Sequence, residues 1–400
     1  PYLAMTDTPA ASAAPAAPAR LESVYLLRGL VMVVMAIDHV RDFLHFGAIQ
    51  GVDPLDLTRT TGAVFLTRWI THFCAPIFSF LAGTGVCFAL ARGKSRAEMS
   101  WFLITRGAWL IVLELTLLMW FGWMFKITLD FYVLATLWSL GWSMIVLAGL
   151  IWLPTGLVAA LGLALMLLHN AFDGVAPAAW GAWAPLWQVL HAGGFFDLGR
   201  IHFWAFYPLI PWPGVMALGY VFGSLYRLDG AARRRRLWQL GFGLTAAFVV
   251  LRATNLYGNP THWAHQASGL FTVLSFLNCA KYPPSLLYLL MALGPACLPL
   301  AWWDGGTPSW LRPLLAYGRV PMFYYVIHIP LIHAIAWIWA KASFGRADFL
   351  LLAENSPPNA GFGLLVVYAV WAAVVLALYL PCRWFADVKR RRREAWLSYF

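Results

Sequence analysis

An apolar segment of membrane length near the start of the chain, residues 21–46, carries several ionisable side chains. They are Arg28, Asp38, His39, Arg41 and Asp42. Because ionisable groups at bilayer depth are costly, they usually line a helix-bundle interior or a wet cavity. A histidine is well suited to general-base work near neutral pH, and a carboxylate beside it can fix its tautomer. The segment therefore predicts proton-transfer chemistry inside the membrane, with Asp38 or Asp42 as the carboxylate.

The spacing of these residues indicates how one helix would present them. Arg28 and His39 are eleven residues apart. On an α-helix this returns to within about 20° of the same face and separates the two residues by about 16 Å. Asp38, Asp42 and His45 follow one another at helical spacing on an adjacent face. The alternative is that Arg28 reaches the lipid headgroups while Asp38 and His39 lie at the opposite interface.

The composition is that of a polytopic membrane protein. The 400 residues are 61% hydrophobic and 11% charged, whereas a soluble domain carries about 25% charged residues. Lys and Arg outnumber Asp and Glu by 28 to 17, but the basic residues form short clusters between apolar runs, which indicates membrane topology rather than nucleic-acid binding. The five cysteines form no CxxC pair, so we expect neither a disulfide framework nor a metal site.

Apolar runs of about 20 residues predict about ten transmembrane helices. They are expected near residues 23–44, 63–90, 100–122, 131–150, 153–170, 203–226, 237–254, 284–303, 318–340 and 361–381. Basic residues concentrate on one side of this arrangement, which places both termini in the cytoplasm. We therefore expect an all-α polytopic membrane protein with a central cavity. Residues 1–20 are predicted to be a disordered cytoplasmic tail, 21–388 the membrane domain and 389–400 a basic cytoplasmic tail.

Two outer segments also carry features of interest. Residues 170–202 are rich in Trp and contain a Gly-Gly pair, which favours a re-entrant or interfacial cap over a cavity. His262 and His265 have a spacing that suits a metal on a helix, but no third ligand lies in the same run. We favour hydrogen bonding in a loop for this pair.

Arg68 and His72 lie one helical turn apart in the second predicted span. They either share a cavity with the first span or occupy the outer interface. Glu114 is the mid-span carboxylate of the third predicted span, and we expect it to pair with Arg106 or Arg68.

Two further residues sit beside prolines. Lys281 comes just before a helix that starts with proline, and it either anchors the interface or holds an anion on the free amides of that helix. His328 lies mid-membrane, two residues before Pro330. It serves either as a ligand facing a cavity or as a core histidine hydrogen-bonded across helices.

Five segments, taken in order, resemble a known family. They are RLESVYLLRGLVMVVMAIDHVRDF, TRWITHFCAPIFSFLAGTG, FYPLIPWPGVMALGYVFG, FLNCAKYPPSLLYLLMALGP and GRVPMFYYVIHIPLIHA. The set resembles the bacterial DUF1624 family, which is related to heparan-alpha-glucosaminide N-acetyltransferase and the wider transmembrane acyltransferases. The resemblance covers nearly the whole chain from Arg20 onward. The Arg28-x10-His39 spacing is also similar to a signature of membrane acyltransferases that modify O-antigen, in which the histidine is thought essential.

The resemblance implies a multi-pass acyltransferase of the bacterial cytoplasmic (inner) membrane. It implies transfer of an acyl group, expected to be acetyl, from cytoplasmic acetyl-CoA to a hydroxyl or amine of an extracytoplasmic sugar or glycan. In the eukaryotic branch the position matching His39 is Asn, and the catalytic histidine lies further into the first outer loop. The catalytic residue therefore stays open between His39, His45 and His72, with Asp38 as a partner.

The chemistry of acyl transfer suggests roles for the cations. Arg68 or Lys281 would stabilise the developing oxyanion, and CoA phosphates would bind cytoplasmic cations such as Arg28 and Arg106. The candidate donor-binding residues are Arg28, Arg68, Lys281, Arg319 and His328.

Two other functions stay open. Intramembrane charges serve proton relays equally well, so a proton-coupled transporter or flippase of an envelope precursor is one alternative. A non-catalytic membrane partner in envelope synthesis is the other. The chain has no P-loop or GxGxxG motif to suggest ATP or dinucleotide use. The expected partners are membrane lipids, acyl-CoA and the glycan acceptor, without nucleic acid; a homodimer is left open.

Overall fold

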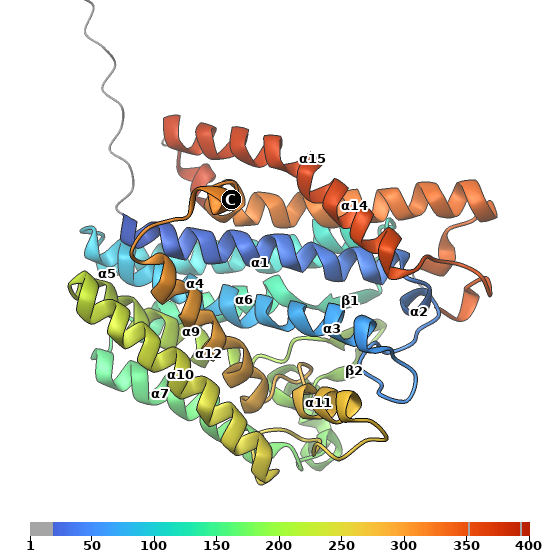
Figure 1. Ribbon diagram of the computed structural model, residues 1–400, viewed down its shortest axis with the longest axis horizontal. Helices are drawn as coiled ribbons and strands as arrows, with labels where there is room; N and C mark the ends of the chain where they lie inside the picture. The colour runs from blue at the N-terminus through green and yellow to red at the C-terminus, as the bar shows by residue number, and fades with distance from the viewer. Residues whose placement is uncertain (1–18, 351–352, 393) are drawn as a thin grey trace, which may run out of the picture.

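The computed structural model describes residues 19–350, 353–392 and 394–400. Helices dominate it, with a small sheet at one side (Figure 1). The helices are α1 (Ala19–Leu44), α2 (Phe46–Ile49), α3 (Gly62–Ile70), α4 (Cys74–Ala91), α5 (Arg96–Leu113), α6 (Thr136–Leu150), α7 (Thr155–Leu168), α8 (Ala184–Trp187), α9 (Trp212–Phe222), α10 (Gly230–Thr254), α11 (Gly269–Leu277), α12 (Leu286–Trp303), α13 (Leu314–Arg319), α14 (Pro321–Phe344) and α15 (Leu364–Arg391). Residues 1–18 of the predicted tail lie outside the described residues, and its last two residues begin α1.

The described residues contain eight helical segments long and apolar enough to cross a membrane. They are Glu22–Leu44, Gly62–Ala91, Arg96–Trp123, Thr155–Phe172, Gly230–Thr254, Leu286–Trp303, Pro321–Phe344 and Leu364–Arg391. The other two predicted spans are shorter, because α6 has 15 residues and α9 has 11. The polytopic, mainly helical membrane fold is therefore confirmed, while two of the ten predicted spans fall short of membrane length.

Helix α1 runs through the middle of the molecule, between α14 and α15 on one side and α4 and α12 on the other (Figure 1). Its closest approach is to α13. A Cβ on Gly29 would lie 2.0 Å from the Leu314 carbonyl oxygen, and a Cβ on Gly318 would lie 1.9 Å from the Tyr25 carbonyl oxygen. Glycine at both positions lets the two backbones touch, as small residues do between membrane helices. This contact holds α1 inside the bundle, where Asp38 and Arg41 are buried.

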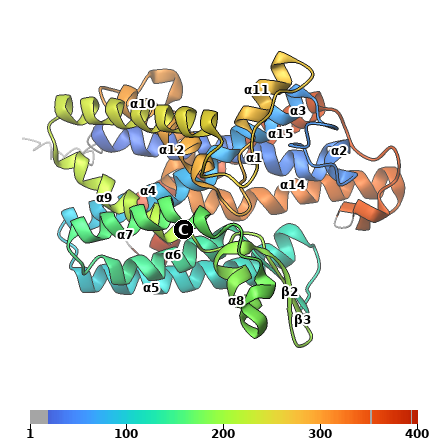
Figure 2. The same ribbon diagram turned by 90° about the horizontal axis from the view of Figure 1, so that it is seen from below.

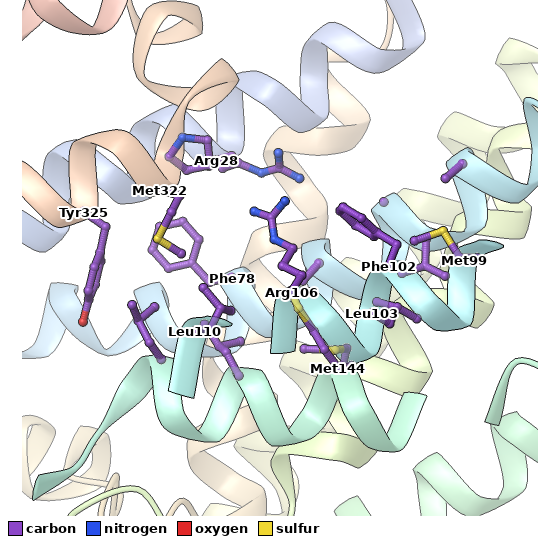
Figure 3. Close-up of a pocket in the computed structure, with 18 of the residues that line it drawn as sticks. Arg28, Phe78, Met99, Phe102, Leu103, Arg106, Leu110, Met144, Met322 and Tyr325 are labelled. Atoms are coloured by element: carbon purple, nitrogen blue, oxygen red, sulfur yellow. The ribbon is translucent and has the colours of Figure 1, made fainter. Parts of the chain in front are cut away.

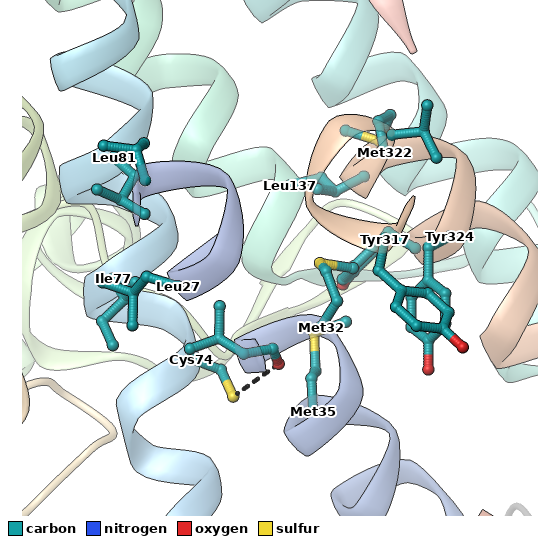
Figure 4. Packing of buried hydrophobic residues seen from close by; sticks show 14 of the residues in the cluster. Leu27, Met32, Met35, Cys74, Ile77, Leu81, Leu137, Tyr317, Met322 and Tyr324 are labelled. Carbon is teal, nitrogen blue, oxygen red and sulfur yellow. Dashed lines mark hydrogen bonds between the residues drawn. The ribbon is translucent and has the colours of Figure 1, made fainter. Parts of the chain in front are cut away.

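The main apolar core joins α1 to α4 and α14 (Figure 4). Leu27 and Met32 of α1 are buried with Ile77 of α4 and Tyr324 of α14. The Cys74 thiol donates to the Val31 carbonyl over 3.4 Å, which ties the start of α4 to α1. All five cysteines are buried free thiols.

Glu114 lies where α5 gives way to a π-helical segment, Glu114–Trp123. Its carboxylate accepts a 2.6 Å hydrogen bond from the Leu137 backbone nitrogen in the first turn of α6. The described residues give it no ion pair, so the predicted pairing with Arg106 or Arg68 is wrong. A carboxylate at a helix N-terminus satisfies a free amide there and is favoured by the helix dipole.

Three short strands form a sheet in the order β1-β3-β2. β1 (Phe131–Leu134) pairs parallel with β3 (Ile201–Ala205), and β2 (Gly194–Leu198) pairs antiparallel with β3. Figure 2 shows β2 and β3 beside α8. Two strands replace the expected starts of the predicted spans 131–150 and 203–226. Short apolar runs rich in aromatic residues suit either a strand or a buried helix, and here tertiary pairing selects the strand.

The predicted cap, residues 170–202, folds as short helical turns that lead into β2. The Trp187 indole donates to the Val175 carbonyl over 2.8 Å, and its ring stacks on that of Trp180. The segment is thus a compact loop held by its own aromatic side chains, of the kind that forms surface loops with defined shape.

Candidate functional site

A cavity of about 550 Å³ lies between α1, α4, α5, α6 and α14 (Figure 3). Its lining includes four cations, Arg28, Arg92, Lys94 and Arg106, and no acidic residue. The Arg28 and Arg106 side chains point toward each other, and Tyr325 lies at the far side of the cavity from Phe102 (Figure 3). Most of the remaining wall is apolar. This space, the Arg28 cavity, suits an anionic ligand with an apolar arm.

The last described residues of the chain pack beside this cavity. The Arg106 guanidinium donates to the Ser398 carbonyl, and the Tyr399 hydroxyl donates to the Thr105 hydroxyl over 2.8 Å. The predicted basic tail 389–400 therefore begins as the end of α15 and finishes against α5. Because Arg106 also lines the cavity, the chain end lies at the same end of the bundle as Arg28.

A buried group of charges lies further along α1. The carboxylate of Asp38 accepts hydrogen bonds from Arg41 over 2.9 Å and from Arg68 of α3. Arg41 also donates to Asp42 over 2.6 Å. We call Asp38, Arg41, Asp42, Arg68 and Lys281 the Asp38 cluster. Arg68 thus shares the interior with the first span, as one of the two alternatives predicted.

Lys281 completes the cluster from the segment between α11 and α12. It is only 7% exposed and interacts electrostatically with Asp38, yet no carboxylate of the described residues lies within ion-pair distance of it. Its ammonium lies 5.2 Å from the Tyr282 ring centre, and the Tyr282 hydroxyl is 3.3 Å from the Tyr207 hydroxyl. The cluster therefore contains one cation more than it has carboxylates to pair with it.

Arg252, at the end of α10, holds the Lys281 segment in place. Its buried guanidinium donates to the carbonyls of Thr261, Ser275, Phe276 and Asn278 at 2.8 to 3.0 Å. We expect Arg252→Met to lower the free energy of unfolding by roughly 3 kcal/mol, because it removes a buried guanidinium and leaves four carbonyl acceptors without this donor. Thermal unfolding in detergent measures this, with the exposed Arg200→Met as the control. Equal midpoints for the two variants would contradict a structural role for Arg252.

His39 lies between the Arg28 cavity and the Asp38 cluster. Its ring centre is 5.0 Å from that of Trp123 and 5.1 Å from that of His328 on α14. The Asp38 carboxylate accepts from arginines rather than from His39, and Nδ1 of His39 is buried without a hydrogen-bond partner. Asp38 thus organises the neighbouring cations and does not fix the tautomer of His39 in this structure.

His328 faces His39 and is fully buried. Its Nδ1 lies 3.0 Å from the Tyr324 carbonyl oxygen and 2.8 Å from the Tyr325 carbonyl oxygen. Tyr325 lines the Arg28 cavity, and His328 follows it by three residues, or about one helical turn. His39 and His328, which we call the histidine pair, therefore lie just behind the cavity wall at Tyr325, and His39 is the chain neighbour of Asp38.

The other predicted site residues have different surroundings. His72 is buried, with Nδ1 3.1 Å from the Arg68 carbonyl oxygen and its ring against Tyr288. His45 accepts from the Gly47 backbone nitrogen over 3.2 Å and caps α2. Burial lowers the pKa of His45, and the neighbouring Arg41 lowers it further. The ring is then neutral near pH 7, as an acceptor must be.

Two sets of residues lie outside these sites. Arg319 is exposed at the end of α13 and is not among the residues that line the Arg28 cavity. In the part of the chain that the structure describes, no group of three or more His, Cys, Asp or Glu is placed to hold a metal ion. His262 and His265 are exposed in a loop.

Sequence reasoning missed three contributors to the site. Arg92 and Lys94 were used only to assign the membrane topology of a short loop. Nothing in the sequence marked Tyr325 except its position one turn before His328. A search for basic residues just before the helix that begins at Arg96 would have identified Arg92 and Lys94. The contact of Trp123 with His39 depends on helix packing and had no sequence signal.

A family model described as "Heparan-alpha-glucosaminide N-acetyltransferase, catalytic" matches residues 20–256. The matched range is more than half of the chain and includes Arg28, His39 and Arg106, whereas Lys281 and His328 lie beyond it. No curated protein matched the chain.

Proposed function

The chain belongs to the heparan-alpha-glucosaminide N-acetyltransferase catalytic family, and from this we propose that it transfers an acyl group from cytoplasmic acyl-CoA to a hydroxyl or amine of an extracytoplasmic sugar or glycan. The observation that supports the proposal is the arrangement of the interior: the Arg28 cavity has Tyr325 in its wall, His328 follows Tyr325 by one turn, and His39 next to Asp38 contacts His328. An acetyltransferase-type activity follows from the family itself. The acyl-CoA donor, the transfer across the membrane and the histidine base are the parts that we add.

The Arg28 cavity has the properties that an acyl-CoA requires. CoA carries several phosphate charges, and arginines bind phosphate through charge-assisted, often bidentate hydrogen bonds. Four cations line the cavity without a carboxylate to compete for them. Arg92 and Lys94 lie in a short loop between two membrane helices, and such basic loops face the cytoplasm. We therefore place the Arg28 end on the cytoplasmic side, and we propose that the membrane is the bacterial cytoplasmic membrane.

The histidine pair and the Asp38 cluster supply the chemistry on the other side. His39 accepts the proton of the attacking hydroxyl or amine. The acyl carbon then carries a developing oxyanion, which Arg68 or Lys281 stabilises in a water-poor site. Asp38 holds Arg68 in place through the buried ion pair. In this arrangement Asp38 positions Arg68, and Arg68 or Lys281 stabilises the oxyanion.

The donor site makes a direct prediction. We expect Arg28→Gln and Arg106→Gln each to raise the Kd for CoA by about tenfold, because each removes one charge-assisted contact to a phosphate. Isothermal titration of the detergent-purified protein with CoA measures this, and higher salt should weaken the wild type more than either variant. Arg235→Gln, an exposed arginine on α10, is the matched control. Unchanged Kd values in both cavity variants would place the CoA elsewhere.

The experiment that tests the function is a donor and acceptor assay. Purified protein is incubated with acetyl-CoA, propionyl-CoA or butyryl-CoA and a mixture of glucosamine and neutral oligosaccharides, and free CoA thiol is measured. We expect acceptor-dependent thiol release, with an acyl group added to a sugar by mass spectrometry. No release with any donor, together with movement of a solute into liposomes, would favour the transporter instead.

A further inference from the structure

We infer that His328 is a second catalytic residue, which carries the proton lost by the acceptor to the sulfur of the departing CoA. The inference rests on the proposed function and deepens it. The hydrogen bonds of His328 determine its chemical state, and its position beside Tyr325 and His39 indicates its task.

The hydrogen bonds of His328 fix its tautomer. Its Nδ1 contacts the carbonyl oxygens of Tyr324 and Tyr325, and a carbonyl oxygen can only accept a hydrogen bond. The proton therefore sits on Nδ1, and Nε2 carries the free lone pair. Nε2 is buried and has no hydrogen-bond partner. A buried polar atom left without a partner is uncommon and costs free energy, so it calls for an explanation.

The position of His328 explains the free nitrogen. Its ring centre lies 5.5 Å from that of Tyr325, which lines the Arg28 cavity, and 5.1 Å from that of His39. The His39 ring also has a buried nitrogen without a partner, Nδ1. His328 is therefore next to both the donor cavity and the base. Neither histidine is among the residues that line the cavity, but His328 lies directly behind the cavity residue Tyr325 and beside His39, so it is the side chain placed to act between them.

The reaction needs a proton at the sulfur. The acceptor O–H or N–H bond breaks and its proton goes to His39, while the acceptor atom bonds to the acyl carbon. The C–S bond then breaks and its electron pair stays on sulfur. A thiol has a pKa of about 8.5 in water, so near pH 7 the departing sulfur takes up a proton.

His328 can deliver that proton without changing its hydrogen bonds. Nε2 accepts the proton from His39 and gives it to the sulfur in the step that breaks the C–S bond. Meanwhile the two carbonyls keep the Nδ1 proton in place and stabilise the brief positive charge on the ring. The products are the acylated acceptor and CoA thiol, and both histidines return to their neutral forms.

Few other groups face His328. The titratable ones are His39 on α1, with which it interacts electrostatically, and Tyr324 and Tyr325 on its own helix. Glu114 of the π-helical segment interacts with Tyr325, but its carboxylate accepts from the start of α6. A change in pH dependence on replacing His328 therefore reports on the histidine pair.

The first test is His328→Gln. We expect kcat to fall by about 100-fold or more, as for loss of a general acid, while the Kd for CoA stays within about twofold of the wild type. Because both histidines must start neutral, the wild-type kcat should fall at acid pH as either ring is protonated, and the variant should keep only the part of this fall that belongs to His39. His333→Gln on the same helix, where the ring bonds to the Gly122 carbonyl, is the matched control and should keep its activity and pH profile.

A second test needs no variant and holds even if His328→Gln does not fold. The wild-type kcat is measured in mixtures of H₂O and D₂O. Two protons in flight give a curved dependence on the deuterium fraction, whereas a single transfer to His39 gives a straight line. A straight line, a His328→Gln kcat within threefold of the wild type, or a loss of kcat with an unchanged pH profile would each overturn the inference. No CoA release by the wild type would instead contradict the proposed function, and the inference with it.

Discussion

His39→Gln should reduce acyl transfer by 100-fold or more while leaving CoA binding intact. Loss of a general base typically costs about 10²- to 10⁴-fold in rate. His39 is the candidate base whose ring contacts His328, which connects it to the donor cavity. By contrast, His45 uses its ring nitrogen to cap α2. The Kd for CoA should stay near that of the wild type because His39 does not line the Arg28 cavity.

The measurement compares His39→Gln, His45→Gln and His72→Gln in the acceptor-dependent CoA release assay. CoA titration and the thermal unfolding midpoint of each variant separate a catalytic defect from misfolding. A His39→Gln enzyme with at least a third of wild-type kcat, beside an inactive and folded His72→Gln enzyme, would assign the base to His72.

Asp38→Asn should destabilise the protein by about 3 to 5 kcal/mol, because it leaves two buried arginines without their shared carboxylate. Arg41 and Arg68 are both bound to Asp38, and the Asp38 side chain is 9% exposed. The neighbouring Asp42 side chain is 38% exposed, so water compensates much of its loss. Asp42→Asn is therefore the matched control, with an expected change below about 1 kcal/mol.

Thermal and denaturant unfolding in detergent measure both variants. The double variant Asp38→Asn, Arg68→Gln should be less destabilised than the sum of the single variants, because the second change removes one of the stranded charges. If Asp38→Asn unfolds at the same midpoint as Asp42→Asn, the buried ion pairs do not hold α1 to α3.

The sequence predicted the membrane helices well because each needs only a long apolar run. All eight helices of membrane length coincide with predicted spans. The prediction failed for the two spans whose helices are shorter than a membrane crossing, 131–150 and 203–226. Residues 201–205 pair as strand β3 with β1, a partner about seventy residues earlier in the sequence, and no local pattern records such pairing.

The candidate site was predictable in part for the same reason. The spacing of Arg28 and His39 predicted a cation and a base at different depths on one helix, and the structure has Arg28 in the cavity wall and His39 outside it. The meeting of His39 with His328 depends on how α1 crosses α14, which sequence spacing within one helix cannot show. The partner of Glu114 was predicted wrongly because it is a backbone amide of α6. Every residue except proline has a backbone amide, so the sequence cannot indicate which one will be the donor.

The most direct measurement of transfer across the membrane uses proteoliposomes with glucosamine and its oligosaccharides trapped inside and labelled acetyl-CoA added only outside. Molecules with the Arg28 end outward should release CoA into the outer medium and leave labelled sugar inside, and His39→Gln vesicles should do neither. Label that remains on acetyl-CoA, or appears equally with His39→Gln, would contradict an acyl route from the Arg28 cavity through the histidine pair.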